Sequence, residues 1–200
     1  MKVELGKIGS FTHGAVLSRI KPKGTEEGIE LPVLTIRQLL LEEEGESPEQ
    51  QAYTKVSQKK RNALPLAREG MIVIGLTSFH KAVVLTAQHK DLIIPSNFLI
   101  LEFPGGIMDA NYFAWYFNEH PGMKQMCQIA IQGDSKVKVL SIHVIRKLTI
   151  DCPDLVTQMA VGNLYRLQRQ KDRLWKEKLR LEMRILTEQM RQITGEEEEI

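Results

Sequence analysis

The 200-residue sequence contains only two cysteines, Cys127 and Cys152, and they do not form a CxxC pair. This spacing excludes a zinc ribbon, and so few cysteines argue against a disulfide framework. No apolar run approaches the ~20 residues that a bilayer-spanning helix needs. Residues 1–4 (MKVE) lack the hydrophobic stretch of a signal peptide. We therefore expect a cytoplasmic protein with no membrane segment.

The sequence also lacks the short motifs that carry common catalytic chemistry. It has no GxGxxG, GxxxxGK(S/T), HExxH or GxSxG pattern, so dinucleotide, nucleoside triphosphate, zinc-protease and hydrolase functions have no motif behind them. No two of its five histidines stand four residues apart, as in a helical metal site. The carboxylate pairs Asp109 with Glu119 and Asp151 with Asp154 are explained more simply as turn and cap residues. We expect no enzyme activity, no cofactor and no metal.

Charge is spread unevenly along a chain whose net charge is only +2. Hydrophobic residues make up 42% and charged residues 26%, as in ordinary globular proteins, and the length allows one domain with an appendage. Basic residues gather in the stretches 55–68, 136–147 and 166–184. Because Lys and Arg supply most phosphate contacts, separate basic clusters predict a polyanion-binding surface. The competing interpretation is an ordinary solvated face.

Residues 1–152 carry the mixed pattern of an α+β domain. Short apolar or β-branched runs predict strands at residues 33–37, 71–74, 82–86, 98–103 and 148–150. Residues 110–118 and 123–131 predict helices that break at His120, Pro121 and Gly122. The acidic segment 42–51, with Gly45 and Pro48, predicts an exposed loop. The fold class is therefore α+β, with a mixed β-sheet followed by one long helix.

Residues 153–194 predict that long helix, and residues 195–200 form an acidic tail. Pro153 and Asp154 mark its start, because proline suits the first helical position and the helix dipole favours an acid there. Apolar residues recur with the 3.5-residue period of a coiled coil, and two lysines interrupt them. These seam residues are Leu164, Leu167, Lys171, Leu174, Lys178, Leu181 and Ile185.

The length of this helix predicts a partner chain. A helix of ~40 residues runs roughly 60 Å, which exceeds the width of a small domain. The sequence shows no second helix for it to pack on, so most of the apolar stripe would lie in water in a monomer. The alternative is a helix that packs on its own domain.

Several segments, taken in order, resemble a known family. They are residues 3–11 with Gly14 and Ser18-Arg19, residues 33–39, residues 66–74, residues 95–98, residues 132–141 and residues 150–158. Together they resemble the specificity (S) subunit of Type I restriction-modification systems, in a half-length form with one target recognition domain and one conserved helix. The chain departs from that pattern at Ala15-Val16, where an aromatic is usual, at Met71, which replaces an aspartate, and by one residue inserted in 132–141.

The resemblance implies a non-catalytic subunit that reads one half of a bipartite site on double-stranded DNA. It implies separate methyltransferase (M) and restriction (R) subunits as partners, and a homodimer joined by two antiparallel helices. The residues that it places near bases are Arg19, Ser78, His80, Lys81, Ser135 and Lys136. The residues that it places on phosphates are Lys59, Lys60 and Arg61.

Each of these contacts has a structural alternative. Arg19 could bridge to Glu26 or Glu27, Phe79 could belong to the core, and residues 59–61 could form a solvated turn. For the chain as a whole, the alternative is a non-enzymatic interaction protein that docks a larger assembly through its C-terminal helix. DNA binding predicts an electropositive face continuous from Lys59 to Lys136, whereas docking needs no such face.

Overall fold

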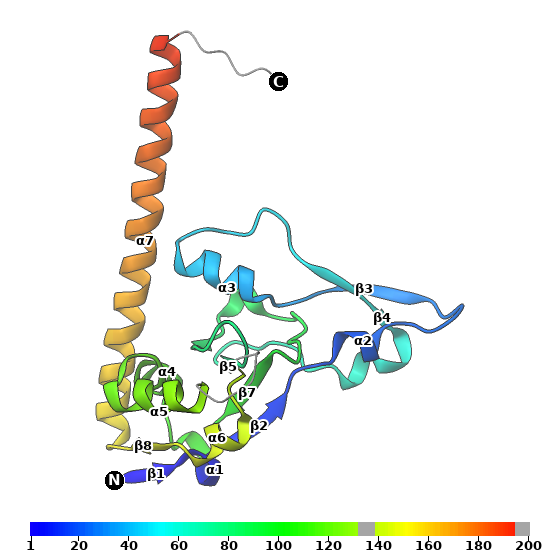
Figure 1. Cartoon of the computed structure of the whole chain (residues 1–200), viewed down its shortest axis with the longest axis vertical. Coiled ribbons are helices and arrows are strands. Elements are labelled where there is room, and N and C mark those ends of the chain that lie inside the picture. The colour runs from blue at the N-terminus through cyan, green and yellow to red at the C-terminus, as the bar shows by residue number, and fades with distance from the viewer. Residues whose placement is uncertain (132–138, 195–200) are drawn as a thin grey trace.

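A single long helix dominates the computed structural model, which describes residues 1–131 and 139–194 (Figure 1). This helix, α7, runs over 40 residues from Leu155 to Thr194. It rises along one side of an α+β domain and continues well beyond it. The predicted fold class, a mixed α+β domain followed by one long helix, is confirmed. Among the described residues, no helix is both long and apolar enough to cross a membrane.

A four-stranded antiparallel sheet forms the centre of the domain. Its order is β2 (Ser10–His13), β7 (Phe98–Glu102), β5 (Ile72–Gly75) and β6 (Ala82–Val84). All four residues of β5 are buried, and Val73 lies opposite both Ile100 and Val83. β-Branched residues fit such a strand because their stiff side chains pack well on a pleated surface. Three of the strands predicted from the sequence are therefore confirmed.

Each face of this sheet contributes to a different core. Ile72 and Ile74 pack with Phe113 and Phe117 of α4 (Ala110–Glu119). Val73, on the alternate face, packs in a second cluster, which also contains Leu39 and Phe98. Helix α5 (Pro121–Ile131) follows α4 after His120, so the break predicted at Pro121 is confirmed.

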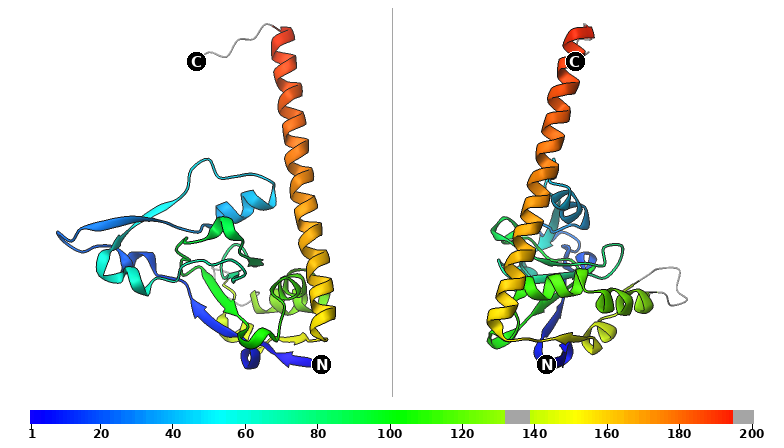
Figure 2. Two further views of the ribbon diagram at one scale, coloured as in Figure 1. Left: turned by 180° about the vertical axis from the view of Figure 1, so that it is seen from behind. Right: turned by 90° about the vertical axis from the view of Figure 1, so that its left-hand side faces the viewer.

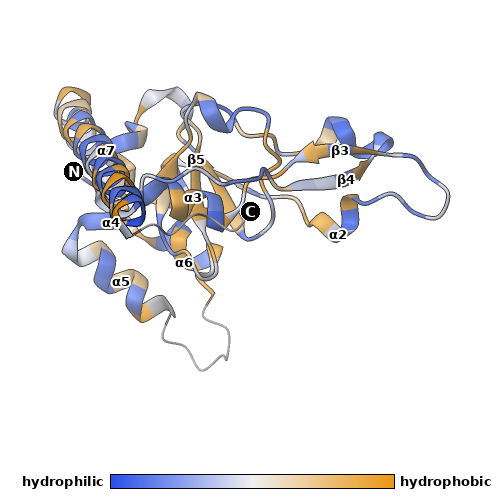
Figure 3. Ribbon diagram, turned by 90° about the horizontal axis from the view of Figure 1, so that it is seen from above, coloured by the Kyte–Doolittle hydropathy of each residue, from blue (hydrophilic) through white to orange (hydrophobic). Residues whose placement is uncertain are grey.

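A small lobe extends from the sheet on the side away from α7 (Figures 1 and 2). We call it the ribbon lobe, and it comprises α2 (Leu17–Ile20), β3 (Gly28–Pro32), β4 (Tyr53–Ser57) and the 3-10 helix η1 (Gln58–Ala63). β3 and β4 pair antiparallel in a two-stranded ribbon. Ile20, Val56 and Ile93 lie in its own small core. Figure 3 shows α7 and the ribbon lobe at opposite ends of the molecule.

Short elements close the base of the domain around the start of α7. β1 (Lys2–Glu4) pairs antiparallel with β8 (Thr149–Asp151), which brings the N-terminus beside the foot of the long helix (Figure 1). The remaining elements are α1 (Leu5–Ile8), η2 (Ala87–His89), η3 (Pro104–Gly106) and α6 (Ile142–Lys147). The strand predicted at residues 148–150 is thus present, displaced by one residue.

The strand predicted at residues 33–37 is wrong. Val33 forms only an isolated bridge to Ile93, and helix α3 (Ile36–Glu43) begins three residues later. The Thr35 side chain caps this helix, since its Oγ1 accepts a hydrogen bond from the Gln38 backbone N–H at 3.0 Å. Such a cap satisfies a donor that the helix start leaves unpaired. The loop predicted at residues 42–51 is corrected in its first part, because residues 42 and 43 belong to α3.

The prediction that α7 has no helix of its own chain to pack on is also wrong. The first turns of α7 pack against α4, and the buried Gln158 joins the two. Its Oε1 accepts a hydrogen bond from the Asp109 backbone N–H at 2.9 Å, and its Nε2 donates to the Pro153 carbonyl at 2.9 Å. Farther along, Asn118 Nδ2 donates to the Tyr165 hydroxyl at 3.0 Å. The alternative of packing on its own domain therefore holds for one face of α7 where the helix runs beside the domain.

Gly162 allows α7 to approach α4 this closely. A Cβ at position 162 would lie 2.3 Å from Asp109 Oδ1 and 2.8 Å from the Tyr112 backbone nitrogen. Neither distance is compatible with packed atoms, so a glycine is required there. The helix itself begins at Leu155, two residues after the predicted start.

Candidate nucleic-acid interface

The ribbon lobe has one apolar face and one exposed face. Along β3 and β4, Ile29 lies opposite Val56, and both belong to the small core of the lobe. Because side chains alternate along a strand, Tyr53 and Lys55 lie on the other face, where both are exposed. An antiparallel two-stranded ribbon of this kind fits the width of a DNA major groove.

Four of the predicted DNA contacts come together in this lobe. Arg19 lies in α2, and Lys59, Lys60 and Arg61 lie in η1. The Lys60 ammonium donates a hydrogen bond to the Arg19 backbone carbonyl, which links the two short helices. Arg19, Lys59 and Arg61 are exposed, and Lys60 is half-buried. The alternative bridge from Arg19 to Glu26 or Glu27 is not among the ion pairs of the described residues.

Glu26 is a structural anchor of this lobe that the sequence alone did not indicate. Ser57 Oγ donates a hydrogen bond to its carboxylate at 2.5 Å, and the Lys23 backbone N–H donates another at 3.4 Å. These hydrogen bonds, together with the charges of Lys59 and Lys60, hold the pKa of the Glu26 carboxyl below its ordinary value. The ionised carboxylate therefore ties the loop that carries Lys23 to the end of β4.

A second group of predicted contacts lies elsewhere, in the loop between β5 and β6. Ser78 is exposed, but Phe79 is buried in the second core, as its alternative interpretation predicted. Lys81 Nζ lies 2.7 Å from Glu43 Oε2 at the end of α3, so its charge is already paired within the chain. His80, which lies between Phe79 and Lys81 in the sequence, is half-buried.

The third predicted group, Ser135 and Lys136, lies outside the described residues. The electropositive face predicted from Lys59 to Lys136 is consequently described only at its first end. There it comprises the ribbon lobe.

Basic residues of α7 meet an acidic turn of the domain. Arg169 lies 2.5 Å from Glu43 Oε1, and Lys176 Nζ lies 2.9 Å from Glu44 Oε1. Arg180 donates to the Gly45 carbonyl at 2.6 Å, and its Nε lies 3.3 Å from the Glu46 carboxylate. We call this set the acidic clasp; its members are Glu43, Glu44, Gly45, Glu46, Arg169, Lys176 and Arg180.

The backbone of the acidic clasp lies directly against the helix. Gly45 has φ +72°, and a Cβ there would lie 2.6 Å from the Arg173 carbonyl oxygen. Glycine meets both demands, the left-handed backbone and the close approach. A charge signal in the sequence could have revealed the acidic clasp, since residues 42–46 are acidic and residues 166–184 are basic.

Glu43 is the most buried carboxylate of the acidic clasp, with 13% of its side chain exposed, and it pairs with both Lys81 and Arg169. Burial alone would raise the pKa of its carboxyl, but the hydrogen bonds from Lys81 and Arg169 outweigh burial and lower the pKa. The carboxylate is thus charged at neutral pH and holds α3, the β5–β6 loop and α7 together.

The seam residues predicted from the sequence are all exposed on α7. They are Leu164, Leu167, Lys171, Leu174, Lys178, Leu181 and Ile185. At 3.6 residues per turn, Leu167 lies roughly half a turn from Tyr165, and Leu174 lies roughly half a turn from Lys176. The seam therefore faces away from the domain, whereas Tyr165 and the acidic clasp face towards it.

The last third of α7 carries a second exposed apolar stripe. It starts where the acidic clasp ends, and it lies on a different side of the helix from the seam, because Met183 is roughly half a turn from both Leu181 and Ile185. Its members are Leu179, Met183, Leu186, Met190 and Ile193, and each is about half exposed or more. Contiguous exposed apolar surface of this kind marks an interaction site.

The acidic side chains that form the two carboxylate pairs of the sequence have structural partners. Within residues 1–131 and 139–194, no group of three or more His, Cys, Asp or Glu side chains could hold a metal ion. Asp109 caps α4, because its Oδ1 accepts from the Tyr112 backbone N–H at 2.8 Å. Asp151 accepts a hydrogen bond from the Tyr116 hydroxyl at 2.9 Å, and Asp154 accepts one from the Thr157 backbone N–H at 2.9 Å. The cap roles expected for Asp109 and Asp154 are thus present, whereas Asp151 is not a turn or cap residue, because it lies in β8 and pairs with Tyr116.

Three solved structures with a similar fold come from Type I restriction-modification systems. The chain is similar to a Type I restriction-modification S subunit from M. genitalium (TM-score 0.55, 15% identity), with 92% of this chain and 43% of that chain covered. It is similar to the HsdS subunit from Thermoanaerobacter tengcongensis (TM-score 0.54, 13% identity), with 90% and 39% covered.

A third similar structure describes complex assembly and conformational transition of the type I R-M system (TM-score 0.59, 12% identity; 93% and 43% covered). The chain spans about two fifths of the length of these three proteins. Neither the protein-family models nor the sequences of curated proteins match it. The resemblance seen in the sequence is confirmed as a likeness of fold: the chain has the architecture of one half of an S subunit.

Proposed function

We propose that this chain is a non-catalytic specificity subunit of a Type I restriction-modification system, which reads one half of a bipartite DNA site. The observation that carries the proposal is the ribbon lobe within an S-subunit fold. That lobe holds Arg19, Lys59, Lys60 and Arg61 on one small protrusion far from α7. Phosphate contacts by such residues position a protein on the duplex, and nearby side chains then read base edges.

The exposed seam of α7 supports a homodimer in this function. Two copies joined through antiparallel helices would hold two ribbon lobes apart, and their twofold symmetry would match an inverted-repeat target. The helix is a suitable spacer because the Gln158 contacts, Tyr165 and the acidic clasp fix one face of it to the domain from its first turns to Arg180. A rigid spacer sets one gap length between the two half-sites.

The methyltransferase and restriction subunits are the proposed sources of catalysis. The second apolar stripe, from Leu179 to Ile193, supports docking of such a subunit, because it remains exposed when the seam is occupied. The same stripe favours the second candidate function, a non-enzymatic interaction protein that docks a larger assembly through its C-terminal helix. The two candidates differ in whether the ribbon lobe binds DNA.

Co-expression with a Type I methyltransferase subunit, followed by sequencing of the methylated sites, tests the proposal. A dimer of identical recognition domains is expected to direct methylation to a gapped, palindromic motif. A triple variant, Lys59→Ala with Lys60→Ala and Arg61→Ala, should abolish that methylation while the chain still co-purifies with the methyltransferase subunit. Co-purification without any defined methylated motif would instead favour the docking function.

A further inference from the structure

The charges of α7 fall into two sets that the chain treats differently. On the side that faces the domain, Arg169, Lys176 and Arg180 each pair with an acidic residue of the acidic clasp. On and beside the seam, Lys171, Arg184 and Glu188 are exposed, and so is Glu177, which borders Gly45 of the acidic clasp at the edge of the seam. None of these four forms an ion pair with another described residue. These four residues comprise two bases and two acids, so a second copy of the same helix can complement them.

We propose that α7 pairs with a second copy of itself in one antiparallel register, with the twofold axis between Leu179 and Arg180. This inference rests on the homodimer of the proposed function and specifies its geometry. In this register Lys171 faces the partner's Glu188, and Glu177 faces the partner's Arg184. Twofold symmetry forms each contact twice, which gives four ion pairs of opposite charge across the interface.

The core of this pairing follows from the spacing of the seam. The seam residues alternate between two heptad positions. In an antiparallel coiled coil, a residue at one of these positions packs in a layer with a partner residue at the other position. Leu174 then meets the partner's Ile185, and Leu181 meets the aliphatic stem of the partner's Lys178. The ammonium of Lys178 stays at the edge of the seam, where it already lies 3.5 Å from Glu182 of its own helix.

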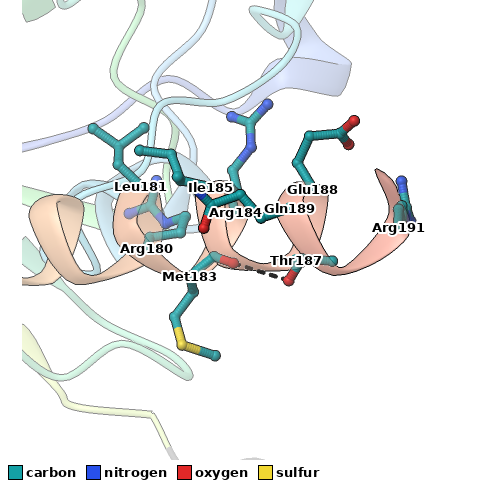
Figure 4. Close-up of a pocket in the computed structure, with 9 residues that line it drawn as sticks. All are labelled: Arg180, Leu181, Met183, Arg184, Ile185, Thr187, Glu188, Gln189 and Arg191. Carbon is teal, nitrogen blue, oxygen red and sulfur yellow. Dashed lines mark hydrogen bonds between the residues drawn. The ribbon is translucent and has the colours of Figure 1, made fainter. Parts of the chain in front are cut away.

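Figure 4 shows the half of this surface that lies beyond the axis. Leu181, Ile185, Arg184 and Glu188 extend from one side of α7, and Met183 extends from the opposite side. The two apolar seam residues and the two charged residues that the register uses thus share one face. Met183, which belongs to the second apolar stripe, is left free by this pairing.

The neighbouring registers are less favourable. Sliding one helix by seven residues in one direction places Glu177 opposite the partner's Glu177. Sliding it by seven residues in the other direction places Arg184 opposite the partner's Arg184, and like charges at such close positions repel. A larger shift that moves the twofold axis closer to the domains leaves Lys171 and Lys178 each opposite a leucine of the partner helix, with no acid across the seam.

The register also sets the distance between the two domains. Leu155 lies about 25 residues from the axis, or roughly 37 Å at 1.5 Å per residue. The starts of the two helices are then about 70 Å apart. A dimer with a different register would space its recognition lobes differently, so the charge pairs act as the device that selects one gap.

A charge-swap experiment tests the register on the whole chain, with dimerisation measured by sedimentation at several concentrations. Lys171→Glu alone and Glu188→Lys alone should each weaken the dimer by about tenfold, because two attractive pairs become two repulsive ones. The double variant should recover to within about threefold of the parent chain. The matched control combines Glu188→Lys with Arg166→Glu, which lies outside the proposed pairs, and it should not recover.

Cysteine cross-linking gives an independent measurement. Lys178→Cys lies three helical positions from its own symmetry mate, about 4.5 Å along the axis, and should form a disulfide-linked dimer on oxidation. Lys171→Cys lies about 26 Å along the axis from its mate and should not. The parent chain, in which Cys127 is buried and Cys152 half-buried, provides the background.

The outcomes separate the register from the dimer. A parent chain that stays monomeric at micromolar concentration overturns the pairing and the dimeric part of the proposed function. A dimer without rescue by the double variant, or with cross-links at Lys171→Cys instead of Lys178→Cys, overturns the register alone. Cross-links at both positions would indicate a parallel pair, which also overturns it.

Discussion

Gly162→Ala tests whether the contact of α7 with α4 anchors the long helix. The added Cβ would lie 2.3 Å from Asp109 Oδ1, the oxygen that accepts the capping hydrogen bond from Tyr112, and 3.1 Å from Asn111 Cβ. Both groups belong to the first turn of α4 or to its cap. The helix can therefore accept the methyl group only by moving away from α4 or by displacing the cap.

The magnitude follows from three opposing terms. Loss of an N-cap costs about 1 kcal/mol. Overpacking at a tight contact costs about 1–3 kcal/mol. Alanine stabilises a helix interior by about 1 kcal/mol relative to glycine, which offsets part of these losses. The net expectation is a loss of about 2 kcal/mol in the free energy of unfolding, which corresponds to roughly 4–8 °C in Tm for a chain of this size.

Gly122→Ala is the matched control, because Gly122 also lies in a helix, α5. A Cβ there would lie 3.4 Å from His120 Cε1, an ordinary contact. Thermal unfolding followed by circular dichroism should therefore show Gly122→Ala unchanged or more stable, and Gly162→Ala less stable. If the Gly162 variant were as stable as the parent chain, the close packing of α7 on α4 would be refuted as its anchor.

Three further predictions concern the acidic clasp, the ribbon lobe and Gln158. Glu43→Gln should lower the free energy of unfolding near pH 7. The difference from the parent chain should shrink as pH falls through and below the ordinary glutamate pKa of 4.5, because a carboxyl with a lowered pKa contributes stability only above that range. Urea titrations at several pH values measure this difference. Lys60→Ala with Arg61→Ala should weaken binding to all duplexes and reduce the slope of log K against log salt by about 2, and an unchanged slope in an anisotropy titration would remove both residues from the interface. Gln158→Ala should cost about 2 kcal/mol in urea unfolding, because the buried Asp109 N–H loses its acceptor; a loss below about 0.5 kcal/mol would contradict that role.

Local patterns in the sequence predict the centre of this fold well. The apolar runs that form β5 and β7 lie in the middle of the sheet, where burial on both faces favours continuous apolar residues. The helix break at Pro121 is equally local, because proline removes a backbone donor and tends to begin a new helix. The failure at residues 33–37 has a similar cause, since a short apolar run does not distinguish a strand from the approach to a capped helix.

Long-range contacts explain most of what the sequence left open. Arg169 and Glu43 are separated by 126 positions, so no local period indicates that they meet. The packing of α7 on α4 depends on Gly162. In the sequence alone, a glycine within a helical pattern could equally mark a position that only weakens the helix. Of the predicted DNA contacts, those in α2 and η1 come together in the ribbon lobe. Lys81 instead joins Glu43, a role that only the tertiary structure shows.

The acidic clasp changes the meaning of the basic stretch 166–184. As a sequence it predicts a polyanion-binding surface, yet Arg169, Lys176 and Arg180 already pair with Glu43, Glu44 and Glu46 of the domain. The basic residues of this stretch that form no ion pair with another described residue are Arg166, Lys171, Arg173 and Arg184, and of these Lys171 and Arg184 accompany the seam. DNA contact is therefore expected from the ribbon lobe, at the opposite end of the molecule, and removing the charges of α7 should alter pairing and stability before it alters affinity for DNA.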